Sequence, residues 1–360
     1  MRIDFKIRQF IQSNDYITID QLIKEALSIN RNSYYKTKKD IGSDGDFITS
    51  PEISQLFGEV IGIWCIDQWQ KLGSPNQCNI VELGPGNGVL MRDALKSIKL
   101  KPDFYNNVSV QLFDINPHFK AVQKRNLSQF DLDITWIDDI SQMKNTPTIL
   151  IANEFFDALP IKQYIKVKEK WYEVIVKIEP FDSKIRFDKI ELTSKQLQAQ
   201  LLHEHVNAQD GAVIEESIES MNIIRLISDQ IKKYTGSALI IDYGYDIKPL
   251  QRTKLQYNGT LQAMQDHQYI PILDSLGIAD LSAHVDFGAL KKIASAHFVN
   301  VVGVIEQSKF LIDHGILLRL NSMDLDLQTK YLLQKQVDRL INPNEMGKLF
   351  KVLIFSSYFS

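Results

Sequence analysis

Short apolar runs and stretches with helical spacing alternate along the chain from about residue 79. Apolar runs of this length, bounded by turn residues, favour strands, and their alternation with helices is typical of a doubly wound parallel sheet. We therefore expect an α/β protein with a Rossmann-like sheet of seven strands. The predicted strands are Ile80–Leu83, Val108–Asp114, Leu132–Ile137, Thr148–Ala152, Ala238–Asp242, Val299–Ile305 and Phe350–Ser356.

The first 75 residues are predicted to be mostly helical and to pack on this core. The segment Thr18–Gln21 has the pattern of a capping box, which marks the beginning of a helix. A longer helix is predicted to have Ser50 as its N-cap and Pro51 as its first residue, and to end at Gly73.

Large insertions are predicted to form a second lobe. A hairpin, Gln163–Ile178, leads into a polar, helix-prone stretch, and Glu215–Tyr234 has the pattern of an amphipathic helix. The long polar region 246–287 shows no periodicity, and such a span is typical of a lid. The predicted organisation is an N-terminal region at 1–75, core segments at 76–165, 211–245 and 291–360, a hairpin and helical insertion at 166–210, a lid or substrate loop at 246–290, and a helical insertion at 307–347.

Composition excludes several classes of protein. The 44 acidic residues against 41 Lys and Arg give a net charge of −3, so nucleic acid is not expected as the main partner. Cys65 and Cys78 are the two cysteines and lack metal-site spacing, so we expect no metal centre, no disulfide framework and a reducing compartment. No apolar run approaches a membrane span, and the start of the chain lacks signal-peptide features, which favours the cytoplasm.

Three glycines at alternate positions, Gly84, Gly86 and Gly88, separate the first predicted strand from a helix. Glycine allows positive φ and the close approach of a ligand to the backbone. A dinucleotide fingerprint would place its third glycine at Val89, and a pyrophosphate would gain nothing from the acidic Glu82. S-adenosylmethionine carries an ammonium group and no phosphate, so the pattern favours it. The alternative is an ordinary bend in an α/β protein.

Acidic residues follow the next strands. In a Rossmann-like sheet, an acid at the end of the second strand lies beside the ribose of a bound nucleoside, which makes Asp114 a candidate cofactor residue. The segment Asp114–Pro117 can equally be a cap and turn that opens the next helix, and both interpretations can hold at once. Asp138, after the third strand, is a weaker candidate for accepting a hydrogen bond from the adenine amino group.

The fourth strand ends in Asn153–Pro160, at the edge where parallel sheets bind their ligands. Glu154 and Asp157 are three residues apart and would lie close together if this segment turned helically. Two acids, the Asn153 amide and two aromatic residues suggest a substrate site. The alternative is that Asn153 and Glu154 cap a helix that follows this strand.

Five stretches together resemble the MidA-type adenosylmethionine-dependent methyltransferases, which include a mitochondrial complex I assembly factor that methylates an arginine. Their order and spacing, more than the glycines alone, make the resemblance specific, and it extends from about Tyr34 to Leu353. The stretches are Gly45–Ser54 with Phe57 and Gly58, Glu82–Gly88, Asn153–Pro160, Asp242–Gly244, and Asp280–Phe287 preceded by Gly259–Ala263.

The resemblance implies a seven-stranded class I methyltransferase sheet and roles for individual residues. Departures from the family pattern are Asn87 in place of Arg, Asp114 in place of Glu, and the absence of Pro-Gly before Asp280. Implied are a cofactor site of Glu82, Gly84, Pro85, Gly86, Gly88 and Asp114, an acceptor site of Asn153, Glu154 and Asp157, and lid or substrate contacts by Thr49, Ser50, Pro51, Glu52, His284 and Asp286.

Methyl transfer from a sulfonium mainly requires the acceptor to be positioned in line with the bond that breaks. For an arginine acceptor, Glu154 would grip the guanidinium and Asp157 would assist, because carboxylates bind it bidentately and can receive its proton. The partner that the resemblance implies is a protein, with a subunit of respiratory complex I as the candidate. A nicotinamide oxidoreductase, a non-catalytic assembly chaperone, a different acceptor and a homodimeric state are alternatives that the residues leave open.

Overall fold

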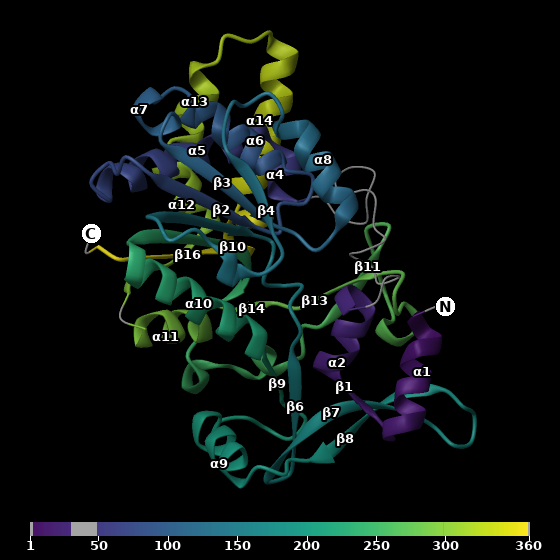
Figure 1. Ribbon diagram of the computed structural model, residues 1–360. Helices are drawn as coiled ribbons and strands as arrows, with labels where there is room; N and C mark the ends of the chain where they lie inside the picture. Colours follow the sequence, from purple (N-terminus) through teal and green to yellow (C-terminus); the bar gives the residue numbers. More distant parts are fainter. Residues whose placement is uncertain (1–2, 30–48, 298, 359–360) are drawn as a thin grey trace. The chain divides into compact units, whose positions relative to one another are not determined.

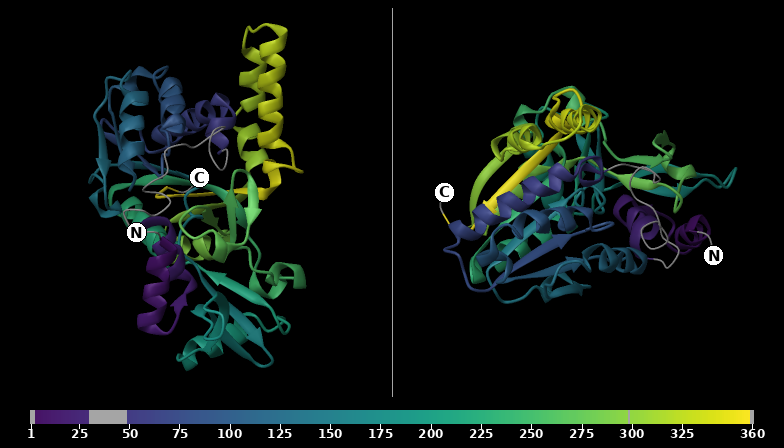
Figure 2. Two further views of the ribbon diagram at one scale, coloured as in Figure 1. Left: turned by 90° about the vertical axis from the view of Figure 1, so that its right-hand side faces the viewer. Right: turned by 90° about the horizontal axis from the view of Figure 1, so that it is seen from above.

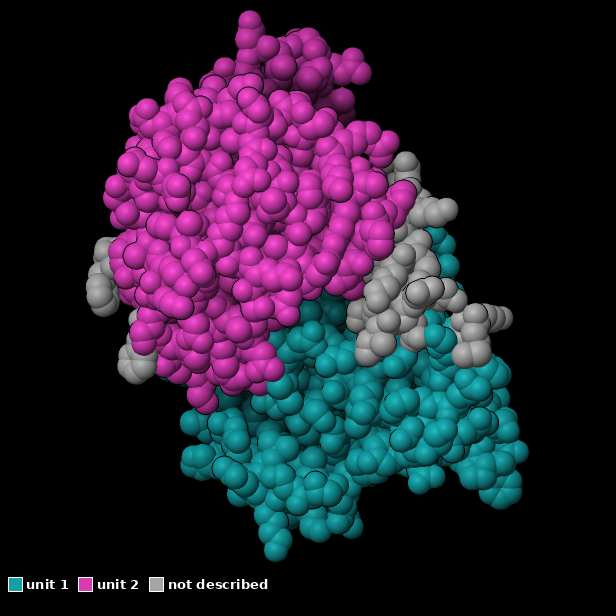
Figure 3. All heavy atoms as spheres, viewed as in Figure 1, with its two compact units in different colours: residues 1–38, 158–220, 246–288 teal, residues 39–157, 221–245, 289–360 magenta. Residues whose placement is uncertain are grey.

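The computed structural model describes residues 3–29, 49–297 and 299–358. The chain forms two compact units, coloured separately in Figure 3. Unit 1 comprises 1–38, 158–220 and 246–288, and unit 2 comprises 39–157, 221–245 and 289–360. The N-terminal region, predicted as one segment at 1–75, is therefore divided between the two units.

The central sheet of unit 2 contains all seven predicted strands, which confirms the predicted fold class (Figure 1). Its strands, in spatial order, are β15 (Asn300–Glu306), β16 (Phe350–Ser356), β10 (Gly236–Tyr245), β5 (Thr148–Asn153), β2 (Cys78–Leu83), β3 (Val108–Phe113) and β4 (Ile134–Ile137). The pairs from β10 to β4 are parallel, whereas β16 runs antiparallel to both of its neighbours. The carboxyl ends of β2, β3, β4, β5 and β10 consequently meet at one edge.

The remaining elements of unit 2 are mostly helices. Four of them lie between β15 and β16, as the predicted insertion at 307–347 requires, and α13 and α14 lie side by side in Figures 1 and 2. The helices are α4 (Ser50–Ile53), α5 (Gln55–Lys71), α6 (Val89–Ile98), α7 (Pro102–Tyr105), α8 (Pro117–Leu127), η2 (Ile140–Gln142), α12 (Gln307–Asp313), α13 (Ile316–Ser322), α14 (Leu327–Ile341) and α15 (Met346–Leu349), with α10 (Ile218–Tyr234) and α11 (Phe287–Ala296) mostly in this unit.

The helix predicted from Ser50 to Gly73 is in fact two helices. Thr49, not Ser50, is the N-cap of the short α4, and Ser54 is extended with φ −151°. The Ser54 hydroxyl accepts a hydrogen bond from the Leu56 backbone N–H at 3.4 Å, so Ser54 caps α5. The predicted end is confirmed, because Gly73 has φ +86° directly after the last turn.

Unit 1 is built around antiparallel sheets. One has the order β1-β7-β6-β9, with β8 paired to β7, and the other the order β12-β11-β13. The elements are α1 (Ile3–Asn14), β1 (Ile17–Thr18), α2 (Ile19–Lys24), η1 (Glu25–Ile29), β6 (Lys162–Val167), β7 (Lys170–Ile178), β8 (Ile185–Glu191), α9 (Lys195–Glu204), β9 (Val213–Glu216), η3 (Pro249–Gln251), η4 (Lys254–Tyr257), β11 (Gln262–Gln265), β12 (Gln268–Ile270), η5 (Ile272–Asp274), β13 (Asp280–Ser282) and β14 (Val285–Asp286).

Some local predictions in unit 1 are confirmed and others are wrong. The capping box at Thr18 and the hairpin of β6 and β7 are present. The stretch 185–191 is a strand rather than part of a helical insertion. Glu215 and Glu216, predicted as the start of a helix, are the last two residues of the strand β9. Most residues of β8 are exposed, so the strand has no apolar pattern that would predict it. Its pairing with β7 is made by the backbone. Region 246–287 contains short strands, too short to show a periodic pattern.

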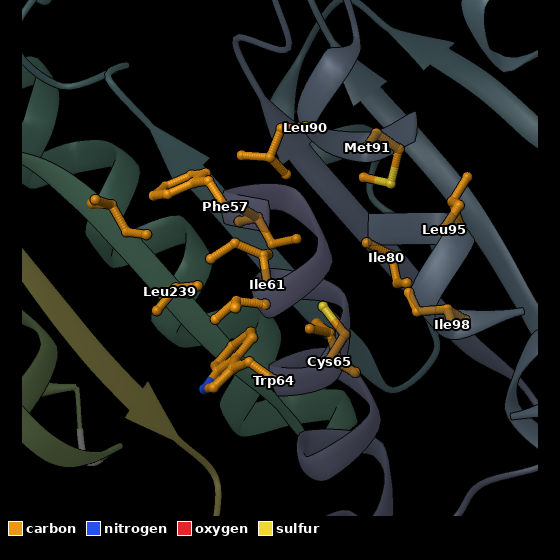
Figure 4. Packing of buried hydrophobic residues seen from close by; sticks show 14 of the residues in the cluster. Phe57, Ile61, Trp64, Cys65, Ile80, Leu90, Met91, Leu95, Ile98 and Leu239 are labelled. Atoms are coloured by element: carbon orange, nitrogen blue, oxygen red, sulfur yellow. The ribbon is translucent and has the colours of Figure 1, made fainter. Parts of the chain in front are cut away.

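The core of unit 2 depends on the packing of α5 against α6, shown in Figure 4. Phe57 and Ile61 of α5 and Leu95 of α6 are fully buried in one cluster with residues of the sheet. Two glycines allow the helices to come this close. A Cβ at Gly58 would lie 2.7 Å from Asp93 Cβ, and one at Gly62 would lie 2.3 Å from the carbonyl oxygen of Ala94.

No helix in the described ranges is long and apolar enough to cross a membrane.

Gly62→Ala is expected to destabilise the protein. At an exposed helical position the same substitution would stabilise the helix by about 1 kcal/mol. The clash is with a backbone oxygen, so no rotamer relieves it, and overpacking of this kind costs about 1–3 kcal/mol. Thermal unfolding should show a lower melting temperature, whereas Gln70→Ala at an exposed position of α5 should change it little. Equal melting temperatures for the Gly62 variant and the unmodified protein would contradict the close helix contact.

Candidate active site

The glycine turn, residues 84–88, joins β2 to α6 as the sequence predicts. All three of its glycines are left-handed, with φ +65° at Gly84, +50° at Gly86 and +75° at Gly88. Residues with a Cβ rarely adopt this conformation, so the turn requires glycine at each position. Gly88 is also the N-cap residue of α6, and the Arg92 N–H donates to its carbonyl oxygen at 3.0 Å.

The backbone of the glycine turn is partly open to solvent. Gly84 is exposed and Gly86 is half-buried, whereas Gly88 is buried beneath Gln123. A Cβ added at Gly84 would come within 2.9 Å of the Phe155 ring, and one at Gly88 within 3.2 Å of Gln123 Cγ. The turn is thus not packed shut, and a ligand can approach the main chain at Gly84 and Gly86.

Gln123 of α8 joins the glycine turn to the end of β3. Its Nε2 donates to Gly86 O at 2.8 Å and to Asp114 Oδ2 at 2.7 Å, and its Oε1 accepts from Trp136 Nε1 at 2.7 Å. Both ends of this fully buried amide are therefore used, which defines its orientation. The sequence does not indicate this role, because nothing in a polar helical residue shows that it has partners distant along the chain.

A second set of contacts holds the other side of the turn. Asn126 Nδ2 donates to Asn87 O at 2.8 Å, and Asn87 Nδ2 donates to Glu52 Oε1 at 3.1 Å. Glu52 was predicted as a lid or substrate residue and lies in α4 with Pro51. Asn87, which replaces the Arg of the family pattern, thus connects α4 to the glycine turn.

Asp114 follows the last residue of β3 and is buried, with 8% of its surface exposed. Its Oδ1 accepts from the Asn116 N–H at 2.8 Å, and Asn116 caps α8, so the predicted cap and turn are confirmed. Burial raises the pKa of the Asp114 carboxyl to about 6 despite these donors. Its link to Gly86 through Gln123 places it beside the glycine turn, as the ribose role requires.

Glu82 is the penultimate residue of β2, and 3% of its surface is exposed. Burial, and to a smaller extent the charge of Asp114, raises the pKa of its carboxyl to about 8. Oε2 of Glu82 is buried and has no hydrogen-bond partner among the described residues. A buried acid that lacks a partner fits an ammonium group, so these residues fit S-adenosylmethionine better than a phosphate.

The rim segment, residues 153–157, begins at the last residue of β5 and continues as bends and a turn instead of a helix. Glu154 has φ +50°, an uncommon conformation for a residue with a side chain. Because no helix follows β5, the alternative that Asn153 and Glu154 cap one is wrong. The backbone of the turn is held instead by Asp242 of β10, whose Oδ2 accepts from the N–H groups of Phe156 at 3.0 Å and Asp157 at 3.2 Å.

Glu154 connects the rim segment to the predicted lid residue Ser50. Its Oε1 accepts from the Ser50 N–H at 2.7 Å and from Asn153 Nδ2 at 3.1 Å. Burial, reinforced by the charge of Asp157, raises the pKa of its carboxyl to about 7. Ser50 Oγ and Asn153 Oδ1 are buried without a partner among the described residues, so polar atoms that could bind a ligand gather around this carboxyl.

Other predicted residues lie elsewhere. Asp138 is exposed and pairs with Lys120. His284 and Asp286 belong to unit 1, where the His284 N–H donates to Thr260 Oγ1 at 2.8 Å and Asp286 accepts from Arg252 Nη2 at 2.7 Å. Residues 45–48 of the family-like stretch lie outside the described residues. In the described part of the chain, no three His, Cys, Asp or Glu side chains gather as a metal ion would require.

The parallel sheet, the open glycine turn and the acids at the strand ends define a class I methyltransferase-like α/β protein. Residues 60–305 match a family model described as "Putative S-adenosyl-L-methionine-dependent methyltransferase". The chain belongs to this family, whose cofactor is S-adenosylmethionine, and the resemblance inferred from the sequence is confirmed.

Named relatives and solved structures agree with this assignment. Protein arginine methyltransferase NDUFAF7, mitochondrial, of Xenopus laevis is 32% identical over 372 residues, which cover 95% of this chain and 81% of the relative. The human protein of that name is 32% identical over 367 residues, covering 94% and 80%. A Burkholderia thailandensis protein crystallised with S-adenosyl-homocysteine has a TM-score of 0.86 at 23% identity, covering 98% of this chain and 91% of that one, which confirms the fold.

Glu82→Gln is expected to affect stability and cofactor binding in opposite directions. The folded protein keeps the Glu82 proton up to about pH 8, against 4.5 for an ordinary glutamate, so the free energy of unfolding falls as the pH rises through this window. The variant should lose less stability over that window, as measured by thermal melting. It should also bind S-adenosylmethionine about tenfold more weakly in calorimetry at pH 8, because the ionised carboxylate is gone. Unchanged affinity would exclude Glu82 from the cofactor site.

Gln123→Leu is expected to weaken S-adenosylmethionine binding by about tenfold to a hundredfold, since Gly86 O and Asp114 lose their common donor. Gln129→Leu, at an exposed position just after α8, is the matched control. Calorimetry with both variants separates a specific role of Gln123 from a general effect of replacing a glutamine in this region. If both bind like the unmodified protein, Gln123 does not organise the site.

Proposed function

We propose that this protein transfers the methyl group of S-adenosylmethionine to an arginine side chain of a protein, and that the acceptor is a subunit of respiratory complex I. The observation that carries the proposal is a group of three carboxyls at the carboxyl ends of β5 and β10: Glu154 and Asp242, whose burial raises their pKa, and the half-buried Asp157. Relatives that are named protein arginine methyltransferases cover most of the chain, and their names support arginine as the acceptor residue. The complex I subunit follows from the family resemblance in the sequence.

The cofactor side is assigned to the glycine turn and the two acids near it. S-adenosylmethionine supplies the methyl group on a sulfonium. The Glu82 carboxylate binds the ammonium group, Asp114 accepts hydrogen bonds from the ribose hydroxyls, and the bare backbone at Gly84 and Gly86 allows close approach. Gln123 holds Asp114 and the turn in one arrangement. Pro85 and Gly88 shape the turn, with the Gly88 N–H bonded to Pro85 O at 2.7 Å.

The acceptor side is assigned to the rim segment. A guanidinium has a pKa above about 12, so it arrives charged and must lose a proton as its nitrogen is methylated. Glu154 binds the guanidinium through its carboxylate, and Asp157 receives that proton. The raised pKa of Glu154 follows from burial beside other carboxyls, and an arriving cation would favour its ionised form. Neutral acceptors would leave these carboxyls without a counter-charge.

For the compartment we propose the cytoplasm, as the sequence predicts, although the relatives named above are called mitochondrial proteins.

Glu154→Gln is expected to lower arginine methylation about a hundredfold while calorimetry shows unchanged S-adenosylmethionine binding, because the amide cannot pair with a guanidinium as a carboxylate does. The assay supplies labelled S-adenosylmethionine and purified complex I subunits of the same cells, and mass spectrometry locates the added methyl. Glu345→Gln, at an exposed position, is the control.

Three outcomes contradict parts of the proposal. Methylation at the unmodified rate by the Glu154 variant would remove Glu154 from the acceptor site. A methyl group found on a residue other than arginine would show that the proposed acceptor residue is wrong. No added methyl on any subunit, with the cofactor bound, would favour the non-catalytic assembly chaperone.

A further inference from the structure

We propose that Tyr243 is a positioning residue for Asp157: its hydroxyl orients the Asp157 carboxylate and keeps it ionised, so that Asp157 receives the proton of the acceptor. This inference rests on the proposed function for the identity of the acceptor. The interaction between Tyr243 and Asp157 can be tested without any acceptor.

The first step is that β10 holds the rim segment by its backbone. The Glu154 N–H donates to Ile241 O at 2.9 Å, and the N–H groups of Phe156 and Asp157 donate to Asp242 Oδ2. Two consecutive residues of β10 therefore fix the main chain of the segment at both of its ends. Asp157 cannot move away from β10 without breaking these bonds.

The second step concerns the ring of Tyr243, which is itself fixed. Its backbone N–H donates to Asp242 Oδ1 at 2.9 Å, and its ring packs against Phe350 of β16 with centroids 5.6 Å apart at 67°. The Tyr243 hydroxyl donates to Asp157 Oδ2 at 2.5 Å. Because both the backbone of Asp157 and the hydroxyl that binds it are held in place, the direction of Asp157 Oδ1 is determined too.

The third step is a division of roles among the three carboxyls. Asp242 is fully buried, and both of its carboxyl oxygens accept hydrogen bonds from backbone N–H groups, so its role is structural. Burial and the charges of Asp157 and Glu154 raise its pKa. Glu154 binds the Ser50 N–H and the Asn153 amide. Asp157 receives an O–H donor, which favours its ionised form over the protonated one.

The proton balance follows from these roles. As the bond from the acceptor nitrogen to the methyl carbon forms and the bond from sulfur to that carbon breaks, the nitrogen loses one proton to Asp157 Oδ1. The Tyr243 proton remains on its own oxygen. The titratable groups facing Asp157 include Glu154 of the same segment and Asp242 and Tyr243 of β10, and Lys351 of β16 lies opposite Asp242 in register.

The test is Tyr243→Phe in the full chain, which keeps the ring and its contact with Phe350. Carbon-13 NMR of labelled aspartate, with the Asp157 signal assigned from Asp157→Asn, should show the pKa of Asp157 raised by about one unit, a tenfold change in its acid constant, because the donor to the ionised form is lost. The matched control is Tyr105→Phe, a half-buried tyrosine that precedes β3 at the opposite edge of the sheet. It should leave this pKa unchanged.

Activity provides the second readout. Tyr243→Phe should lower the rate of methyl transfer about tenfold and move the acid limb of the pH profile to higher pH, since activity is lost as the pH falls through the pKa of Asp157. S-adenosylmethionine affinity should stay within about twofold in calorimetry.

The outcomes separate the two proposals. An unchanged pKa of Asp157 in Tyr243→Phe overturns the positioning role, whatever the activity. A lower rate with an unmoved acid limb assigns Tyr243 to packing alone and also overturns it. If the unmodified protein transfers no methyl group, the proposed function fails, and a shifted Asp157 pKa would still establish the interaction by itself.

Discussion

Acidic side chains are buried where the parallel strands end, and the rest of the site depends on how they are accommodated. Glu82, Asp114, Glu154 and Asp242 lie at the ends of β2, β3, β5 and β10, and burial is the largest cause of the raised pKa of each. Moving a charged carboxylate out of water is unfavourable unless hydrogen bonds or opposite charges compensate. N–H donors compensate the carboxyls of Asp114, Glu154 and Asp242 in this way.

The donors are distributed according to role. Asp242 accepts from three backbone N–H groups and holds the rim segment, so its carboxyl serves the fold. Asp114 accepts from one backbone N–H and one amide, which leaves lone pairs for a ligand. Glu82 keeps an oxygen without any partner in the described chain. A sulfonium cofactor and the proposed guanidinium acceptor are both cations, so each would add the opposite charge that the N–H donors do not supply.

The sequence predicted more of the scaffold than of the site. Apolar runs located all seven strands of the central sheet, and three alternate glycines located the turn where the cofactor is proposed to bind. Asp114 and the rim segment were found because parallel strands bring their carboxyl ends to one edge. The strand β8 was missed, since a mostly exposed strand has no apolar pattern to distinguish it from a polar helix. The strand β9 was missed because its four residues are too few to show a period.

By itself the sequence determined the strands of the central sheet, the glycine turn and the family, because these depend on local patterns of residues along the chain. The tertiary structure alone decided which polar groups meet. Ser50 and Glu154 are 104 positions apart, Phe156 and Asp242 are 86 apart, and Gln123 lies 37 positions from the Gly86 carbonyl that it binds. No local propensity encodes such pairs. They exist because the order of strands in the folded sheet brings distant chain segments to the same edge.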